Sequence, residues 1–300
     1  MTADARVAMP LAVTLAGLAR AHPDNSVEVY ICFRRFPQAL RDKTASAGSG
    51  KLEIHWLDLN DYDFSGLQIP KDYDTVLLPL LIPERLPEGD RILYLDSDLL
   101  IREPLTELWL FPLGDSAIAA VRDEHLPTFG VKTAVEPWVK LGLSPDSAYF
   151  NSGVYLANLE TWREERVAEK ALALIGCHRF AHPDQTALNI CFADRWQELH
   201  PRWNVFPGTI EQYSSTPKPK ATSDKLREAT ESPAIVHFAG PRKPWHWSFG
   251  RLPSFSQEWF ELLAQTEWRG FRPRFGSAAL KRWSVSLVRT AKAAVFPSPR

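Results

Sequence analysis

The chain contains three Asp-x-Asp triplets, and the type and spacing of their residues would allow them to bind a metal ion. Asp96-Ser97-Asp98 stands between two apolar runs, whereas the triplets at 61–63 and 72–74 lie in polar surroundings and are predicted to be solvated turns. In extended backbone, residues two apart point to the same side about 6.6 Å from each other, so both carboxylates can share one divalent cation. A buried carboxylate pair is costly unless a cation compensates its charge. Oxygen ligands favour Mn²⁺ or Mg²⁺ over Zn²⁺, so this triplet predicts such a site; the alternative is a carboxylate pair that caps the next segment.

His237 is the second candidate ligand, because it lies in a strand-like run, 233–239, that opens into a loop with useful chemistry. Gly240 lets backbone approach a ligand closely, and Lys243 carries a point charge suited to a diphosphate. A single histidine in a strand is equally consistent with a hydrogen-bonded core residue. Its position directly before the glycine–lysine loop leaves both interpretations open.

Hydrophobic periodicity predicts the elements that must position these residues. Strands that alternate with helices predict an α/β fold in which helices cover a largely parallel sheet, with ligands beyond the carboxyl ends of the strands. The stretch 212–232, rich in Ser, Thr, Lys and Pro, is expected to be a loop. The predicted helices are 9–20, 74–81, 160–175 and 184–192, and the predicted strands are 26–33, 51–57, 91–95, 117–121, 149–156 and 233–239.

The bulk composition argues against several classes of protein. Of 300 residues, 45% are hydrophobic, which is enough for the core of one large or two small domains. The formal net charge of −1 argues against a uniformly basic nucleic-acid-binding surface. Cys32, Cys177 and Cys191 have no Cys-x-x-Cys spacing, which argues against a disulfide framework and a zinc finger and fits a reducing cytosol. Neither a secretion signal nor an apolar run of about 20 residues is present, so we expect a cytoplasmic protein.

Four segments, in order along the chain, resemble the family 8 glycosyltransferases, the group that includes lipopolysaccharide galactosyltransferases and glycogenin. The likeness spans about residues 2–246. It implies a GT-A type fold, with a Rossmann-like mixed sheet flanked by helices, over a domain of residues 1–265. It also implies transfer of a hexose from a UDP-sugar, with retention at the anomeric carbon, to a glycan or lipopolysaccharide-type acceptor. The segments are 91–98 (RILYLDSD), 149–154 (YFNSGV), 182–189 (HPDQTALN) and 237–245 (HFAGPRKPW).

The resemblance assigns a metal site and a donor site to residues of this chain. Asp96, Asp98 and His237 would ligate Mn²⁺ (or Mg²⁺), which bridges the donor diphosphate. Lys243 and the backbone at Gly240 would stabilise the same oxygens. The other residues assigned to the nucleotide or the donor sugar are Asp4, Ser97, Asn151, Asp184 and Gln185.

Gln185 is the expected catalytic group, together with Asn151 and Asp184. By the family pattern it faces the anomeric carbon opposite the leaving group. Because a carboxamide is a poor nucleophile, we expect a front-face mechanism. In it, the leaving phosphate takes the acceptor proton and Gln185 stabilises an oxocarbenium-like centre. A retaining glycosidase instead uses two carboxyl groups about 5 Å apart. Asp123, at the end of its own strand, matches an acceptor-side position. Without the family context, Asn151 and Gln185 would be interpreted as ordinary capping or surface hydrogen-bonding residues.

Two places depart from the family pattern. Where a full first strand is usual, the chain begins MTAD, so the first strand is expected to be truncated, either because the natural chain starts upstream or because the enzyme is impaired. After the uracil-facing Asp4, the usual Asn and Tyr are replaced by Arg6 and Val7.

The second departure is that the family's Tyr-Arg-Leu is replaced by Leu78-Pro79-Leu80. Because proline cannot supply a positive charge, the affinity for the donor is expected to be reduced. Two other basic residues are candidates to replace that charge: Lys71 and Arg242.

The C-terminal residues 266–300 are expected to form a basic amphipathic tail. After Glu267 there is no acidic residue, and eight basic residues alternate with apolar ones. Such a tail suits peripheral contact with an anionic membrane, here the inner face of the cell membrane; the alternative is a solvated basic terminus.

Two other functions stay open at this stage. A metal-dependent nucleotidyltransferase or sugar-nucleotide pyrophosphorylase would need a glycine-rich phosphate loop near the N-terminus, but residues 1–20 contain one glycine, Gly17. A catalytically impaired pseudo-glycosyltransferase that binds partners or glycan is favoured by the shortened first strand and by Pro79.

Overall fold

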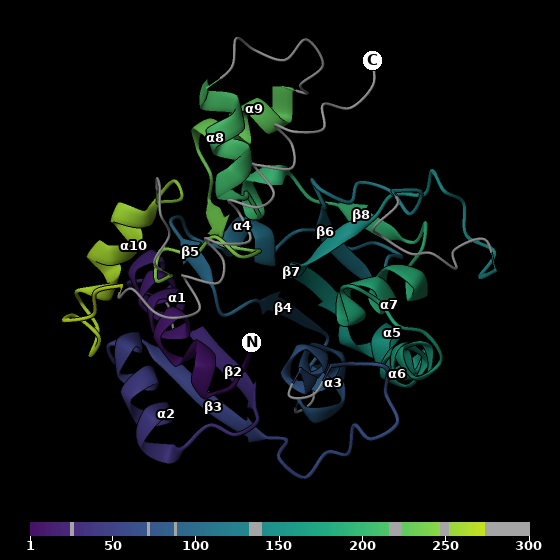
Figure 1. Cartoon of the computed structure of the whole chain (residues 1–300), viewed down its shortest axis with the longest axis horizontal. Helices are drawn as coiled ribbons and strands as arrows, with labels where there is room; N and C mark the ends of the chain where they lie inside the picture. Colours follow the sequence, from purple (N-terminus) through teal and green to yellow (C-terminus); the bar gives the residue numbers. More distant parts are fainter. Residues whose placement is uncertain are drawn as a thin grey trace, which may run out of the picture.

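The computed structural model of the chain describes residues 1–24, 27–70, 73–86, 89–131, 140–215, 224–246 and 252–273. It is a mixed α/β structure in which α1, α2 and α10 lie on one side and α5, α6 and α7 on the other, with β4 and β7 between them (Figure 1). The helices are α1 (Ala8–Ala21), α2 (Gln38–Ala45), α3 (Leu78–Arg85), α4 (Thr106–Trp109), α5 (Leu159–Glu164), α6 (Val167–Cys177), α7 (Pro183–Cys191), α8 (Pro207–Ser215), α9 (Asp224–Glu231) and α10 (Ser256–Leu263), with 3₁₀ turns η1 (Ala5–Val7), η2 (Ser46–Gly48), η3 (Asp74–Leu77) and η4 (Pro201–Trp203). The strands are β1 (Thr2–Ala3), β2 (Val27–Phe33), β3 (Leu52–Asp58), β4 (Arg91–Leu95), β5 (Leu99–Ile101), β6 (Ile118–Arg122), β7 (Phe150–Asn158), β8 (Trp196–Glu198) and β9 (Ile235–His237).

The described strands form three sheets, and only the N-terminal one is wholly parallel. It has the order β1-β2-β3. The second sheet has the order β4-β7-β6-β8, in which β7 is antiparallel to both of its neighbours and β8 is parallel to β6. The third is the antiparallel pair β5-β9. The largely parallel sheet predicted from periodicity is therefore wrong, and the mixed α/β fold implied by the family resemblance is confirmed.

The antiparallel pairing of β4 with β7 is what assembles the site. In this register Leu95 pairs with Val154, so the carboxyl end of β4 meets the first half of β7. The backbone N–H of Asp96 then donates to the carbonyl of Gly153 at 2.8 Å. On the other side of Asp96, β5 pairs with β9 so that Leu99 lies opposite His237. Two strand pairings thus bring residues from 96 to 237 to one place.

The first strand is short, as expected from the sequence. β1 has two residues, and Thr2 and Ala3 pair in parallel with Cys32 and Phe33 of β2. The 3₁₀ turn η1 follows at once, with Asp4 as its N-cap. Asp4 is thereby held at the carboxyl end of β1.

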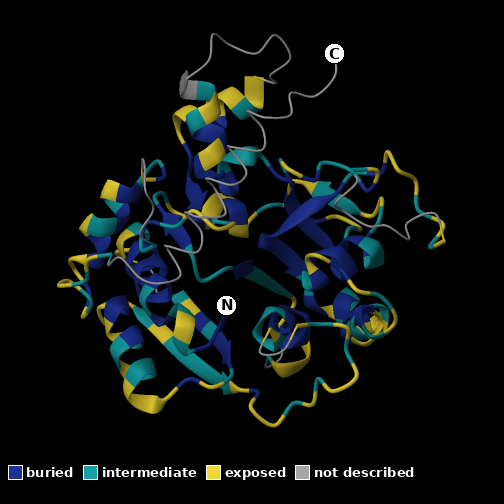
Figure 2. Cartoon of the chain, in the orientation of Figure 1, coloured by how far each residue is buried: buried dark blue, intermediate teal, exposed yellow. Residues whose placement is uncertain are grey.

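Two apolar clusters fill the space between the sheets and the helices. One packs α1 against β5 and β9 and includes Leu11, Leu15 and Leu100, while the other surrounds the second sheet together with α3, α6 and α7. β7 is buried from Phe150 to Ala157, so helices or strands cover both of its faces (Figure 2). Burial of one large aliphatic side chain contributes about 1.5–3 kcal/mol, so these clusters hold the strand ends rigidly.

Three predicted elements differ from the observed ones. α3 continues past Pro83 to Arg85, because the buried residues Leu78 and Leu80–Ile82 hold its turns in place although the proline removes one helix hydrogen bond. The helix predicted at 160–175 is two helices, since Arg166 adopts a left-handed φ of 53° between α5 and α6. Within 212–232, where a loop was predicted, the described residues include the end of α8 and the whole of α9.

The predicted C-terminal tail falls largely outside the described residues, which end at 273. Within the described part, no helix combines the length and the apolar character that crossing a membrane requires.

Candidate active site

The Asp96-Ser97-Asp98 segment is held by backbone contacts from several elements. Thr14 of α1 is fully buried, and its hydroxyl donates to the carbonyl of Leu99 at 2.9 Å, with the carbonyl of Ser97 3.2 Å away, and accepts the N–H of Leu99 at 3.1 Å. The carbonyl of Asp98 accepts the N–H of Phe238 at 3.1 Å. The turn between β4 and β5 therefore has little freedom, and its two carboxylates are preorganised.

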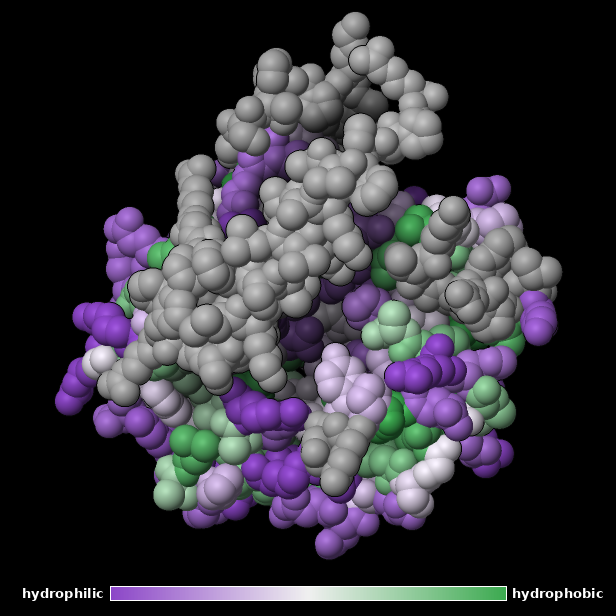
Figure 3. Space-filling view, in the orientation of Figure 1, coloured by the Kyte–Doolittle hydropathy of each residue, from purple (hydrophilic) through white to green (hydrophobic). Residues whose placement is uncertain are grey.

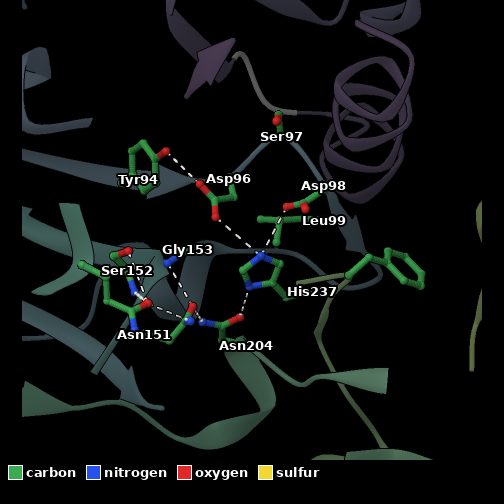
Figure 4. A network of polar contacts seen from close by, with 12 residues as sticks. Tyr94, Asp96, Ser97, Asp98, Leu99, Asn151, Ser152, Gly153, Asn204 and His237 are labelled. Carbon is green, nitrogen blue, oxygen red and sulfur yellow. Dashed lines mark hydrogen bonds and ion pairs between the residues drawn. The ribbon is translucent and has the colours of Figure 1, made fainter. Parts of the chain in front are cut away.

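Asp96, Asp98 and His237 converge on one point (Figure 4). Nε2 of His237 lies 3.2 Å from Oδ1 of Asp98 and 3.5 Å from Oδ2 of Asp96. One ligand atom from each of the three residues lies within 4.8 Å of the others. Two carboxylates and one imidazole nitrogen are a donor set for a divalent cation, as the sequence predicted.

Hydrogen bonds that begin at the backbone fix which nitrogen of His237 carries its proton. The N–H of Gly153 donates to Asn151 Oδ1 at 3.0 Å, which identifies that atom as the oxygen. Asn204 Nδ2 donates to the same oxygen at 2.8 Å, so Asn204 Oδ1 faces Nδ1 of His237, also at 2.8 Å. Nδ1 is thus the protonated nitrogen of the neutral ring, and the Nε2 lone pair points at the two carboxylates. That arrangement is repulsive by itself and favourable around a cation, so the residues fit a divalent metal ion.

The charges of the triad are unequal. Burial alone would raise the pKa of Asp98, but the ammonium group of Lys243 beside it holds that pKa well below its usual range. Burial raises the pKa of Asp96, and repulsion from Asp98 raises it further. Tyr94 donates its hydroxyl to Oδ1 of Asp96 at 2.8 Å, which leaves Oδ2 to face His237.

Glycine is the only residue type that fits at position 153 in β7. A β-carbon there would lie 2.3 Å from Cε1 of His237 and 2.8 Å from Oδ2 of Asp96, far inside contact distance. The glycine of the 149–154 segment therefore leaves the space in which the triad forms.

Lys243 lies at the edge of the triad and contacts both Asp98 Oδ2 and the carbonyl of Phe238. Gly240, three residues earlier, has a φ of 76°, a left-handed conformation that glycine adopts without strain. The turn at Gly240 brings Lys243 back over Asp98, so its ammonium group lies next to the predicted metal position.

A second hydrogen-bonded group continues from Asn151 to Gln185 and Asp123. Oε1 of Gln185 accepts from Asn151 Nδ2 at 3.0 Å and from the N–H of Ser152 at 3.1 Å. Nε2 of Gln185 and Nδ2 of Asn151 both point to Oδ2 of Asp123, at 3.2 and 3.1 Å. Oδ1 of Asp123 caps the following turn by accepting the N–H groups of His125 and Leu126. The side chains of Asn151, Gln185 and Asp123 are therefore locked in place.

Asp184 and Asp4 are the remaining acidic residues of the site. Asp184 lies in the first turn of α7 and accepts the hydroxyl of Ser152 at 3.2 Å, and burial raises its pKa. Asp4 is bound by Arg6 and by Thr75, whose hydroxyl lies 2.9 Å from Oδ2 of Asp4. Burial would raise the pKa of Asp4, but these hydrogen bonds lower it, so Asp4 is ionised at neutral pH.

All eleven residues predicted from the sequence line one cavity of about 770 Å³. In the space-filling view, this face of the molecule is hollowed near its centre, with hydrophilic side chains in its depth (Figure 3). Pro79 also lines the cavity and Arg242 lies at its wall, whereas Lys71 is outside the described residues. The predicted residues are Asp4, Asp96, Ser97, Asp98, Asp123, Asn151, Asp184, Gln185, His237, Gly240 and Lys243.

The sequence did not reveal Asn204, which links the triad to the Asn151–Gln185 group. Asn204 is 1% exposed and follows the short turn η4. No periodic pattern or charge marks it. Only its place between two buried residues, Trp203 and Val205, hints that its amide needs internal partners.

The chain belongs to glycosyl transferase family 8, whose sequence profile matches residues 1–248. It is similar to General stress protein A of Bacillus subtilis (strain 168), with 32% identity over 202 residues that cover 65% of each protein. It is also similar to lipopolysaccharide 1,2-glucosyltransferase of Escherichia coli (strain K12), with 29% identity over 207 residues, 66% of this chain and 57% of that enzyme. The chain thus spans less than two thirds of the length of these curated relatives.

Among solved structures, the chain is similar to galactosyltransferase LgtC in complex with donor and acceptor sugar analogues. The TM-score is 0.73 at 27% identity, covering 90% of this chain and 98% of that one. The fold is thus that of LgtC, a GT-A type glycosyltransferase, as the family resemblance implied.

Proposed function

We propose that this chain is a retaining hexosyltransferase that uses a UDP-sugar donor, a divalent cation and a glycan or lipopolysaccharide-type acceptor. The observation that carries the proposal is that the Asp96–Asp98–His237 triad and the Asn151–Gln185–Asp123 group line one cavity and are joined through Asn204. A metal site next to an array of neutral amides suits a diphosphate beside a sugar.

The triad and Lys243 are proposed to hold the donor diphosphate. When bound, Mn²⁺ or Mg²⁺ supplies Lewis-acid stabilisation of the charge on the leaving UDP. Lys243, which reaches Asp98, adds a second positive charge at the same place. Gly240 and Ser97 line the cavity beside them, and their backbones suit the diphosphate oxygens.

Gln185 is proposed to stabilise charge rather than to attack the sugar. Its Oε1 already accepts hydrogen bonds from Asn151 and from the backbone of Ser152, so both lone pairs are engaged. A nucleophilic attack would have to break these bonds, whereas electrostatic support of an oxocarbenium-like centre would not. The front-face mechanism expected from the sequence agrees with this arrangement. An active-site glutamine-to-glutamate mutant of LgtC has also been solved.

The acceptor side is proposed to lie at Asp123, which shares its Oδ2 between Gln185 and Asn151. A lipopolysaccharide or other glycolipid is the favoured acceptor class, because the similar enzymes of Escherichia coli and Salmonella typhimurium are lipopolysaccharide glycosyltransferases. The basic tail proposed for residues 266–300 would bring the chain to the anionic inner face of the membrane where such acceptors lie.

A catalytically impaired glycosyltransferase that binds glycan is the second candidate, and Pro79 is the observation that favours it. Pro79 lines the cavity where the family pattern has an arginine, and it supplies no charge to the donor. Family membership, in turn, argues against the nucleotidyltransferase alternative.

A screen of UDP-sugars tests the proposal. Purified protein with Mn²⁺ is incubated with UDP-glucose, UDP-galactose and UDP-N-acetylglucosamine, and UDP release with water as the acceptor is measured. Proton NMR recorded before mutarotation equilibrates the released sugar determines its anomeric configuration. We expect release from a UDP-hexose with retention, and its loss in Asp98→Asn. Asp61→Asn is the matched control, because Asp61 belongs to another Asp-x-Asp triplet and is exposed outside the cavity. If no sugar is turned over but UDP with Mn²⁺ still binds, the impaired alternative holds.

A further inference from the structure

The cavity continues beyond the triad to a second end, which is built from η1 and η3. Thr75 of η3 donates its hydroxyl to Oδ2 of Asp4 at 2.9 Å, across 71 residues of sequence. This hydrogen bond fixes the two segments side by side at the cavity wall. The residues that line this end are Asp4, Arg6, Val7, Tyr73, Thr75 and Val76.

Arg6 and Asp4 place a hydrogen-bond donor beside an acceptor at this end. Nε of Arg6 lies 2.9 Å from Oδ2 of Asp4, and the backbone N–H of Arg6 lies 2.8 Å from Oδ1. The Asp4 side chain is 5% exposed, whereas that of Arg6 is 61% exposed. The carboxylate is thus a fixed acceptor at the cavity floor, and the guanidinium is a planar group with most of its surface open.

Tyr73 supplies an aromatic face to the same end of the cavity. Its side chain is 43% exposed, and of the large hydrophobic side chains exposed in the described part of the chain it alone lines the cavity. Among the described residues its ring has no aromatic or cation–π neighbour. It immediately precedes η3, whose Thr75 is bonded to Asp4, so its backbone position is anchored. An aromatic ring that faces a cavity beside a fixed donor–acceptor pair suits a flat heterocycle with polar edges.

We propose that Tyr73 and Arg6 form the nucleobase-binding end of the donor cavity. The Tyr73 ring stacks on the face of the base, and the guanidinium of Arg6, beside the carboxylate of Asp4, binds the base edge. This inference rests on the proposed function, because it assigns the part of the nucleotide that lies farthest from the triad. It gives the chain a base-binding aromatic residue that directly precedes η3, in a cavity where η1 contributes Val7.

The test compares a ligand with a base and a ligand without one. Isothermal titration calorimetry in the presence of Mn²⁺ measures the dissociation constants of UDP and of inorganic pyrophosphate for each variant. Stacking on an aromatic side chain corresponds to a loss of about 5- to 150-fold on truncation to alanine. We expect Tyr73→Ala to weaken UDP binding by at least about fivefold and to leave pyrophosphate binding unchanged, whereas Tyr73→Phe retains UDP binding. Arg6→Ala should weaken UDP binding in the same selective way.

Two control variants change residues of similar type that lie outside the cavity. Trp109→Ala removes an aromatic side chain of nearly equal exposure, 42%, and Arg122→Ala removes an arginine that is paired with Glu198; both variants should bind UDP like the wild type. Equal UDP affinity in wild type and Tyr73→Ala, or equal losses for UDP and pyrophosphate, overturns the inference while the proposed function stands. Tighter UDP binding by Arg6→Ala overturns the role of Arg6, because it means that the arginine competes with the base for Asp4. If the wild type binds pyrophosphate but not UDP, the nucleotide-sugar function fails, and this inference with it.

Discussion

Nδ1 of His237 lies 2.8 Å from Oδ1 of Asn204, and this contact determines the chemistry of the other ring nitrogen. Because the orientation of Asn204 is set by Asn151 and, through it, by the backbone N–H of Gly153, the Nε2 lone pair of His237 is directed at the triad. Asn204 thus orients His237 as a metal ligand in the absence of a cation.

Asn204→Leu is predicted to weaken Mn²⁺ binding by about 10- to 100-fold, the usual effect of removing the partner of a ligating histidine. Leucine has similar volume but offers no acceptor to Nδ1 of His237. Isothermal titration calorimetry with MnCl₂ measures the change. Asn60→Leu is the control, because the exposed side chain of Asn60 accepts a hydrogen bond from the backbone N–H of Arg35, outside the cavity. Unchanged Mn²⁺ affinity in Asn204→Leu would show that the histidine is not oriented by this contact.

Gly153→Ala is predicted to abolish the thermal stabilisation by Mn²⁺, because the new β-carbon would occupy the space of His237 and Asp96. The melting temperature is measured with and without MnCl₂. Gly176→Ala is the matched control: its β-carbon would meet only Leu67 Cδ2, at 3.7 Å, and should leave the Mn²⁺ response intact. An intact response in Gly153→Ala would mean that the triad does not bind the ion in the observed geometry.

Glu124→Gln is predicted to stabilise the fold at alkaline pH. Burial and repulsion from Asp123 raise the pKa of Glu124 from 4.5 to about 8, and neither carboxylate oxygen has a hydrogen-bond partner within the described structure. Between these two values the folded chain holds a proton that the unfolded chain has released, so the free energy of unfolding falls as the pH rises through this window. Glutamine does not ionise, so it removes this loss.

Urea denaturation near pH 8.5 and near pH 5 measures the difference. The variant should exceed the wild type by on the order of 1 kcal/mol at the higher pH and by much less at the lower one. Glu160→Gln, at an exposed position of α5, should show no such dependence. A constant difference at both pH values would refute the raised pKa.

The triad was predictable from the sequence because its residues carry local signals. Asp96 and Asp98 stand between apolar runs, and His237 precedes a glycine–lysine loop, so type and spacing made each of them a candidate ligand, and the family resemblance joined them in one metal site. The order of the four family segments then placed Asn151 and Gln185 in the same site. The structure brings all of these residues to one cavity, while their roles in catalysis stay predictions.

The sheet topology and the supporting residues were not predictable in the same way. Alternating strands and helices do not distinguish parallel from antiparallel neighbours, and β7 pairs antiparallel with both β4 and β6. Asn204 is bonded to Asn151, 53 residues away, and Tyr73 and Arg6 are distinguished by their exposure in the cavity. Such relationships exist only in the folded chain, and no periodic pattern records them.

Electron paramagnetic resonance of Mn²⁺ in the presence of UDP measures whether the triad binds the cation. We expect the wild type to bind the ion and Asp98→Asn, which lacks one charged ligand of the triad, to bind it at least about tenfold more weakly. Equal Mn²⁺ affinity in the two proteins would mean that the cation lies elsewhere than between Asp96, Asp98 and His237.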